Sequence, residues 1–358
     1  MSLRELLGVD FPLVAFSHCR DVVAAVTNAG GFGVLGAQTF TPEQLDQELT
    51  WIDEHVGGRP YGADVIIPTS YASGPELVVP AGHRAFVADL LAAHGIDLTV
   101  DDALLAGRPT VREGLGEELL DVVFDHPVRL VANALGVPPP SMIRRAKATG
   151  VPVAALVGSR EHALAQVRAG VDVVVAQGTE AGGHTGEVST MVLVPEVVEA
   201  VAPVPVLAAG GIVTGRQVAA AVALGAAGAW TGSVWLTTRE AGLPASTVRK
   251  LLAASSRDTV RSTARTGKPA RQLASAWTSA WSTGPAALPM PVQGLLAEPV
   301  LRRLDTLADK GNEEAMALVT YFVGQGVGLM NAVAPAAEVV RAMAEDYLAA
   351  TERLAGAS

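Results

Sequence analysis

Three glycine-rich segments hold the residues whose types and spacing could support catalysis or anion binding. The first runs from Gln177 to Gly186 and combines four glycines with one histidine, His184. Glycine lets the main chain approach a flat or charged ligand, and histidine can transfer a proton near neutral pH. We therefore expect a ligand contact with an acid–base group here. A flexible loop with a solvated histidine is the alternative.

The other two segments are suited to binding an anion. Gly210-Gly211 and Gly232-Ser233 each follow a short apolar run. In such loops the main-chain N–H groups can point at an anion, and the N-terminus of a following helix adds a favourable partial charge. We expect these four residues to bind a phosphate group. The alternative is that the glycines only allow helices to pack closely on strands.

A repeated pattern of helix, glycine and strand would position these segments. Residues 141–149 precede Gly150 and a β-branched run, and residues 161–169 precede Gly170 and a second such run. Glycine suits the position after a helix, and Val/Ile-rich runs are typical of strands buried on both faces. The expected strands are 12–16, 32–35, 61–67, 128–132, 151–157, 171–176, 204–208 and 228–231.

Eight strands with helices between them predict an α/β fold, a closed (β/α)8 TIM barrel. A doubly wound open sheet is the structural alternative. The three glycine-rich segments follow the sixth, seventh and eighth expected strands. Active sites of these barrels lie at the carboxyl ends of the strands, and loops seven and eight commonly bind phosphate. One end of the barrel would therefore carry all three segments.

Two segments interrupt the pattern. Residues 68–120 follow the third strand, contain an expected helix at 83–94, and are too long for an ordinary βα loop. We expect a lid or side wall over the catalytic end, with a passive surface insertion as the alternative. After Leu236 the sequence predicts helices at 245–255, 300–323 and 334–354. The predicted domains are a barrel, 1–240, and a helical subdomain, 241–358, which packs beside the active site and completes the last barrel helix.

Composition excludes several classes of protein. The net charge is -10, without a run of Lys or Arg, which argues against nucleic-acid and membrane-surface binding. Cys19 is the single cysteine, so an intramolecular disulfide and a cysteine-rich zinc site are excluded. We see neither a signal peptide nor a membrane span, and no metal site is expected. These features favour a cytoplasmic enzyme.

Several motifs resemble those of one enzyme family, the nitronate monooxygenases, once called 2-nitropropane dioxygenases. The resemblance covers most of the chain except the insertion. The motifs are NAGGFG at 28–33, QG at 177–178, EAGGHTG at 180–186, AAGGI at 208–212, LGA at 224–226, GS at 232–233 and, more weakly, QG at 325–326.

The resemblance implies tightly bound flavin mononucleotide (FMN). Gln177 would contact the flavin, and Gly182, with Gly183 beside it, would lie against the ring or its ribityl chain. The phosphate would be held by Gly210, Gly211, Gly232 and Ser233. His184 matches the catalytic histidine of the family.

The sequence departs from the family pattern at three places. Members commonly have a Pro-Met pair after the first strand, where this chain has Phe16-Ser17-His18-Cys19. The third strand commonly carries Asn, where this chain has Asp64, which we include among the cofactor-binding residues. Trp230-Thr231 replaces a common Gln-Met pair. These changes bear on the substrate more than on the flavin.

The resemblance implies an FMN-dependent oxidoreductase that oxidises nitronates or nitroalkanes with dioxygen. Two alternatives stay open. The first is an FMN-dependent enoyl-thioester reductase, which would use NAD(P)H. The second, more remote, is a flavin-free barrel that binds a phosphorylated metabolite. The sequence does not determine the oligomeric state and leaves a homodimer open.

The remaining polar candidates are weaker. His18 follows the first strand and could line the pocket, with a structural role as the alternative. Cys19 is interpreted as a small buried apolar residue. Lys268 and Arg271 could neutralise an anion, but solvated charges are the default. The other histidines have no convergent partners in the sequence, and surface roles are expected for His55, His83, His94, His126 and His162.

Overall fold

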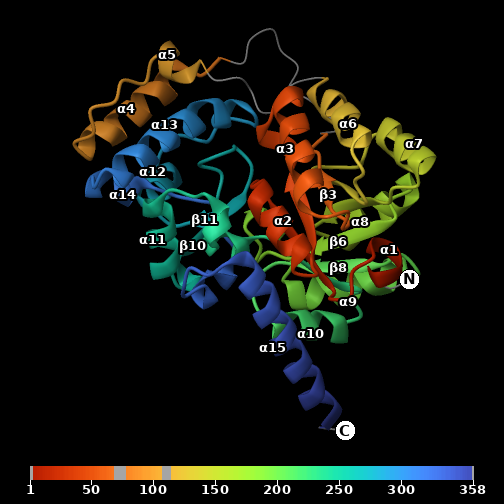
Figure 1. Cartoon of the computed structure of the whole chain (residues 1–358). Helices are drawn as coiled ribbons and strands as arrows, with labels where there is room; N and C mark the ends of the chain where they lie inside the picture. Colours follow the sequence, from red (N-terminus) through yellow and green to blue (C-terminus); the bar gives the residue numbers. More distant parts are fainter. Residues whose placement is uncertain (1–2, 68–77, 107–113, 357–358) are drawn as a thin grey trace.

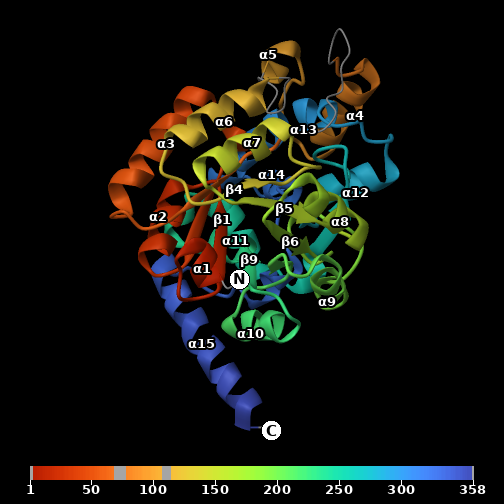
Figure 2. The same ribbon diagram turned by 90° about the vertical axis from the view of Figure 1, so that its right-hand side faces the viewer.

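The computed structural model describes residues 3–67, 78–106 and 114–356. Eight parallel strands close into a barrel in the order β1-β2-β3-β4-β5-β6-β8-β9, with β9 paired back to β1 (Figures 1 and 2). The predicted TIM barrel is therefore confirmed. The strands are β1 (Leu13–Ser17), β2 (Phe32–Gly36), β3 (Gly62–Asp64), β4 (Val131–Asn133), β5 (Val153–Val157), β6 (Val173–Gln177), β8 (Val206–Ala209) and β9 (Gly228–Thr231).

Alternate side chains from these strands fill the barrel interior. Val14, Phe32, Val175 and Trp230 belong to one buried cluster there, together with residues of the short helix α1 (Leu3–Leu7). Because α1 precedes β1, it closes the amino-terminal end of the barrel, and the carboxyl ends of the strands stay available for a site.

A ring of helices surrounds the barrel. Its last member, α15 (Ala336–Gly356), packs against both α10 and α2, so the ring closes with a helix from the carboxyl-terminal end of the chain (Figure 1). The approach is close, because a Cβ added to Gly215 would lie 1.8 Å from the Met343 carbonyl oxygen. The other ring helices are α2 (Arg20–Asn28), α3 (Pro42–His55), α6 (Leu115–Asp125), α7 (Pro140–Thr149), α8 (Arg160–Ala169), α9 (Thr190–Val201) and α10 (Gly215–Ala223).

A second lobe lies beside the barrel (Figure 1). Its buried cluster joins Val87 and Leu91 of α4, from the insertion, with Trp277, Trp281 and Leu296 from the carboxyl-terminal part. Its helices are α4 (Ala81–Ala93), α5 (Asp102–Leu105), α11 (Ala245–Ala253), α12 (Ala276–Thr283), α13 (Val292–Asp309) and α14 (Glu313–Leu318). Each part thus contains a helix from the other part's stretch of sequence: α4 lies in the lobe, and α15 lies on the barrel.

The expected lid is only partly visible in this arrangement. Residues 68–77 and 107–113 lie outside the described residues. Helix α6 begins at Leu115, inside the expected insertion, and packs against α3 as part of the barrel ring.

The expectation of a purely helical segment after Leu236 was wrong in two respects. Strands β10 (Thr259–Ser262) and β11 (Ala270–Leu273) form a small antiparallel sheet with β7 (Gly183–His184). The helix expected at 300–323 is two helices, which separate at Gly311, where φ is +89°. Pro299 lies inside α13 and does not begin a new helix. Short 3-10 turns include η2 (Ser233–Thr237), η3 (Arg239–Ala241) and η5 (Gln325–Leu329).

Candidate active site

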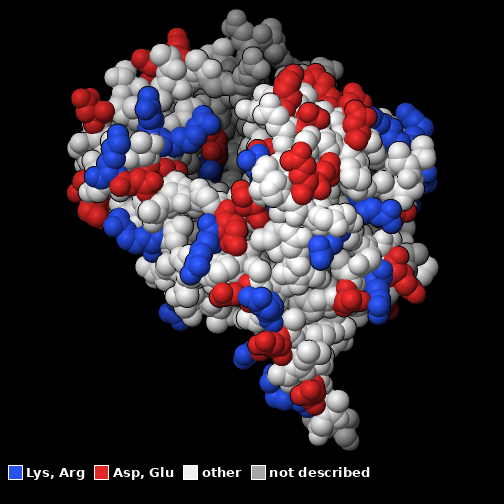
Figure 3. Space-filling view, in the orientation of Figure 1, with Lys and Arg blue, Asp and Glu red and all other residues white. Residues whose placement is uncertain are grey.

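A hollow separates the second lobe from the barrel on the face shown in Figure 3. The carboxyl ends of the barrel strands carry Asp64 on β3 and Gln177 on β6, and the loops after β8 and β9 carry the other predicted glycines. The barrel therefore brings the predicted residues to one end, and β7 places His184 on the loop after β6. We call this end the barrel mouth.

The loops after β8 and β9 present main-chain donors. Gly210 and Gly211 have φ of +112° and +70°, which favours glycine. Within the described part of the chain, the N–H groups of Gly210, Gly211, Gly232 and Ser233 donate to no protein atom. A Cβ added to Gly232 would find no atom of the described residues within 4 Å. Four free donors beside open space form an arrangement that fits a phosphate group.

Protein groups already accept from several main-chain N–H groups at the start of α10. The Gln217 side chain accepts from the N–H groups of Val213 and Thr214 at 2.9 and 3.0 Å. Asp346 of α15 accepts from the Arg216 N–H at 2.7 Å. Donors for an anion therefore come from the loops before the helix.

Contacts within the protein explain two glycines of the histidine loop, residues 177–186. A Cβ added to Gly182 would lie 2.8 Å from the Val323 carbonyl carbon, and one added to Gly178 would lie 2.4 Å from the Thr190 nitrogen. Close main-chain packing therefore requires glycine at these positions whether or not a ligand is bound. Gly183 differs, because a Cβ there would meet no atom of the part of the chain that the structure describes within 4 Å.

His184 is held by the small sheet. It pairs with Ala270 of β11, and its Nδ1 lies 3.4 Å from the Pro269 carbonyl oxygen. Because a carbonyl can only accept, this contact favours the tautomer with hydrogen on Nδ1 and a lone pair on Nε2. Burial lowers the pKa of His184, and the Lys268 charge lowers it further, against the opposing effect of the Pro269 contact. At neutral pH the ring is therefore an uncharged base.

Two arginines bind the histidine loop from the other face of this sheet. Arg271 donates from Nε to the Thr179 carbonyl at 2.8 Å and from Nη1 to the Thr259 hydroxyl at 3.0 Å. Arg261, its cross-strand partner, lies 3.4 Å from the Thr185 carbonyl. Arg271 is only 7% exposed, so the expectation that it is a solvated charge was wrong.

Glu180 connects the histidine loop to the loop after β8. Its carboxylate accepts from the Thr190 N–H at 2.9 Å and from the Thr190 hydroxyl at 2.8 Å. The Thr190 hydroxyl also lies 3.1 Å from the Gly210 carbonyl. Sequence reasoning did not single out this Glu–Thr pair, whose partners are ten residues apart.

Polar and aromatic side chains line the floor of the mouth. The Phe16 and Trp230 rings stack with centroids 6.4 Å apart, and His18 lies edge-on to Phe16 at 5.1 Å. Burial lowers the pKa of His18, whose Nδ1 lies 3.0 Å from the Gly36 carbonyl oxygen. Two of the positions that depart from the family pattern, His18 and Trp230, therefore both pack against Phe16, and the pocket-lining role of His18 stays a prediction beside the structural one.

Asp64 pairs with Gly36 of β2 and faces the barrel interior. A Cβ added to Gly62 would lie 3.0 Å from Phe32 in the barrel interior, and Asp64, two residues further along the strand, shares that face. Its Oδ1 is buried without a hydrogen-bond partner in the described part of the chain. Burial raises the pKa of this carboxyl to about 7.

The other predicted residues have simpler surroundings. The Ser233 hydroxyl accepts from the Gly324 N–H at 2.8 Å, which joins the loop after β9 to the segment before η5. Gln177 ends β6 on the face that Val173 and Val175 direct into the barrel. Cys19 is partly buried, and its Sγ lies 2.9 Å from the Glu240 carbonyl.

One histidine with an expected surface role was misjudged. His126 lies between Asp53, at 2.7 Å from Nδ1, and Asp46, at 3.2 Å from Nε2, and its side chain is 9% exposed. Asp53 also accepts from the Tyr61 hydroxyl at 2.6 Å. Because Tyr61 directly precedes β3, this cluster lies at the amino-terminal end of the barrel, away from the mouth.

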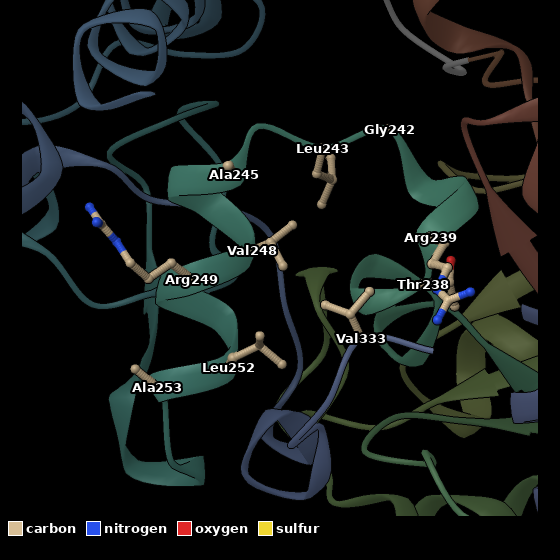
Figure 4. Close-up of a pocket in the computed structure, with 10 residues that line it drawn as sticks. All are labelled: Thr238, Arg239, Gly242, Leu243, Ala245, Val248, Arg249, Leu252, Ala253 and Val333. Atoms are coloured by element: carbon tan, nitrogen blue, oxygen red, sulfur yellow. The ribbon is translucent and has the colours of Figure 1, made fainter. Parts of the chain in front are cut away.

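A second hollow, of about 690 Å³, lies outside the mouth (Figure 4). Leu243, Val248, Leu252 and Val333 give it an apolar lining, and none of the predicted site residues lines it. In the residues that the structure describes, no group of three or more His, Cys, Asp or Glu side chains could hold a metal ion. None of the described helices combines the length and the apolar character needed to cross a membrane.

Known proteins resemble this chain over most of its length. The family model described as nitronate monooxygenase matches residues 7–346. A candidate monooxygenase of Mycobacterium tuberculosis is 53% identical, over 99% of this chain and 98% of its own. A probable nitronate monooxygenase of Staphylococcus saprophyticus is 31% identical, over 86% of this chain and 88% of its own.

Solved structures with the same fold include a nitroalkane oxidase from Streptomyces ansochromogenes. It aligns with a TM-score of 0.83 at 31% identity, covering 99% of this chain and 100% of its own. A variant of FabK from Thermotoga maritima aligns with a TM-score of 0.73 at 26% identity, covering 100% of this chain and 99% of its own.

Proposed function

Because this chain belongs to the nitronate monooxygenase family, we propose that it uses FMN to oxidise nitronates or nitroalkanes with dioxygen. The family is one of flavin-dependent oxidoreductases, and the chain is an enzyme of that class. One observation carries the finer proposal: the barrel end that presents four free main-chain donors also holds an uncharged histidine base.

The residues of the mouth fit FMN. Gly210, Gly211, Gly232 and Ser233 offer N–H groups to the phosphate, and the open space in front of Gly232 leaves room for it. Gln177, Gly183 and Asp64 would contact the rest of the molecule, and Gly182 would contribute through the loop that it lets pack closely. When bound, FMN supplies the redox chemistry, with dioxygen as the final electron acceptor.

His184 then performs the proton transfer. A neutral nitroalkane must lose a proton from the carbon beside the nitro group, and the lone pair on Nε2 can accept it. The carbonyl of Pro269 orients the ring through Nδ1. A nitronate has already lost that proton, so His184 would only orient it. Arg271 and Arg261 would act as positioning residues, because they contact the main chain of the loop that carries His184.

The likeness to FabK supports no reaction by itself. An enoyl thioester serves as the control substrate, because enoyl-thioester reduction is the alternative activity. The enoyl-thioester reductase alternative requires NAD(P)H, whereas nitronate oxidation does not.

The test is an absorption spectrum followed by two assays. We expect flavin bands in the purified protein and release of FMN, identified against FAD and riboflavin standards, on denaturation. Oxygen consumption should rise with alkyl nitronates, while NADPH oxidation with an enoyl thioester should stay at background. A colourless protein that cannot be loaded with FMN would refute the proposal. Enoyl-dependent NADPH oxidation without nitronate turnover would favour the reductase.

A further inference from the structure

One polar group in the mouth is buried without a partner. Asp64 is 4% exposed, and neither carboxylate oxygen makes a hydrogen bond within the described part of the chain. A buried charge without a partner is strongly disfavoured, and a carboxyl in such a place takes up a proton instead. Like an amide side chain, the neutral acid then offers both a hydrogen-bond donor and an acceptor.

The barrel order places this carboxyl across the mouth from the free N–H groups. β3 is the third strand of the closed barrel, and β8 and β9 are the seventh and eighth. A ligand whose phosphate binds after β8 and β9 must therefore extend over the mouth toward β3. Asp64 faces inward there, beside the space that the His18 ring occupies in front of Gly36.

We propose that Asp64 binds FMN as a neutral carboxylic acid, which donates its proton to an acceptor atom of the flavin ring, so that flavin affinity falls when Asp64 ionises. This inference rests on the proposed function, because it assumes that FMN occupies the mouth. It adds a dependence of flavin binding on pH that an asparagine at the same position would not produce.

The groups that face Asp64 leave it free to titrate. On the β2 side the nearest titratable group is His18, which its lowered pKa keeps uncharged at neutral pH. On the β4 side lies Ala132, followed by Asn133, which donates to the Gly136 carbonyl at 3.1 Å and accepts from the Ile67 N–H at 3.0 Å. Burial is the cause of the raised pKa of Asp64, without a charged neighbour among the described residues.

The sign of the effect follows from this raised pKa. Below it the free protein already carries the proton that the flavin contact needs. Above it the proton must be added on binding, so the apparent dissociation constant of FMN rises up to tenfold per pH unit. With a pKa of about 7, the rise between pH 6 and pH 8.5 should be about thirtyfold.

The experiment titrates FMN, by quenching of its fluorescence, into full-length protein freed of flavin by dialysis. Wild type is compared with Asp64→Asn at each pH, because the FMN phosphate also titrates in this range and cancels in the ratio of the two dissociation constants. The dissociation constant of wild type divided by that of Asp64→Asn should rise about thirtyfold from pH 6 to pH 8.5. Asp305→Asn is the matched control, since burial also raises the pKa of Asp305, in the second lobe. This variant should keep the wild-type pH dependence.

Three results would overturn the inference. A constant ratio would show that Asp64 does not titrate in contact with the flavin. A ratio that falls with pH would show that the ionised carboxylate accepts a hydrogen bond from the flavin. Loss of the pH dependence in His18→Gln, with its retention in Asp64→Asn, would assign the proton to His18. Failure of both wild type and Asp64→Asn to bind FMN at any pH would instead overturn the proposed function, and this inference with it.

Discussion

Replacing His184 tests whether this residue removes the proton of a nitroalkane, because a nitronate is oxidised without that step. His184→Ala removes the Nε2 base and the contact between Nδ1 and Pro269. That contact, at 3.4 Å, is longer than a good N–H···O hydrogen bond, so its loss should cost at most about 1 kcal/mol. The loop keeps its arginine contacts and the bond from the Gln325 N–H to the Glu180 carbonyl at 2.8 Å. We therefore expect the variant to fold and to retain FMN.

The loss of activity should depend on the substrate. General-base assistance is worth about 10² to 10⁴ in rate, and only the neutral nitroalkane requires it. We expect kcat/KM for a nitroalkane to fall by about that factor and kcat/KM for the matching nitronate to fall by less than about tenfold. In wild type the lowered pKa of His184 keeps the base unprotonated to lower pH, so nitroalkane activity should decline only below the usual histidine range.

The assay is oxygen consumption with both substrates at matched flavin content. His184→Asn serves as the control, because its amide can still donate to Pro269 but cannot act as a base. Equal losses on nitroalkane and nitronate would refute the argument and show that His184 orients the substrate. Recovery of nitroalkane activity in His184→Asn would likewise refute proton abstraction. Unchanged rates in both variants would leave the histidine without a catalytic role.

Three further predictions concern the phosphate loop, the histidine loop and the second lobe. Gly232→Asp puts a negative side chain into the open space and should abolish FMN binding while the circular dichroism spectrum is kept; full flavin occupancy would contradict it. Arg271→Met removes two hydrogen bonds and should lower kcat about tenfold, whereas Thr259→Val, which removes one, should have a smaller effect; equal rates in all three proteins would exclude a positioning role. Leu91→Ala should destabilise the protein by about 2–5 kcal/mol with FMN still bound, as measured by thermal and urea unfolding; an unchanged midpoint would show that α4 is not part of the core.

The barrel could be predicted because its signals are local. The β-branched runs at 151–157 and 171–176 became β5 and β6, and Gly150 and Gly170 adopt the positive φ that the pattern implied. Strand β3 is shorter than the expected 61–67. Strands β10 and β11 were missed because each has four residues with mixed polarity, and pairing with β7 and with each other makes them strands.

The loops of the candidate site could be predicted from the sequence. The distant residues that hold these loops in place could not. His184 and the open glycine at 232 lie at the barrel mouth, as the order of strands required. Arg271 looked like an ordinary surface charge because its acceptor, the Thr179 carbonyl, is 92 residues away in the chain. Gly182 looked like a ligand contact because the main chain that it meets, at Val323, belongs to a distant part of the sequence.

The attachment of the histidine loop to the end of the chain has a consequence for biosynthesis. β7 needs β11, Ser233 accepts from Gly324, and the ring of helices needs α15 to cover the gap between α10 and α2. A nascent chain that has emerged only as far as β9 therefore has all eight barrel strands but neither a fixed histidine nor a closed helical ring. Such contacts between distant segments form slowly. The histidine loop and the helical ring should accordingly be completed only after release from the ribosome, and chains that terminate early should accumulate as open barrels subject to proteolysis.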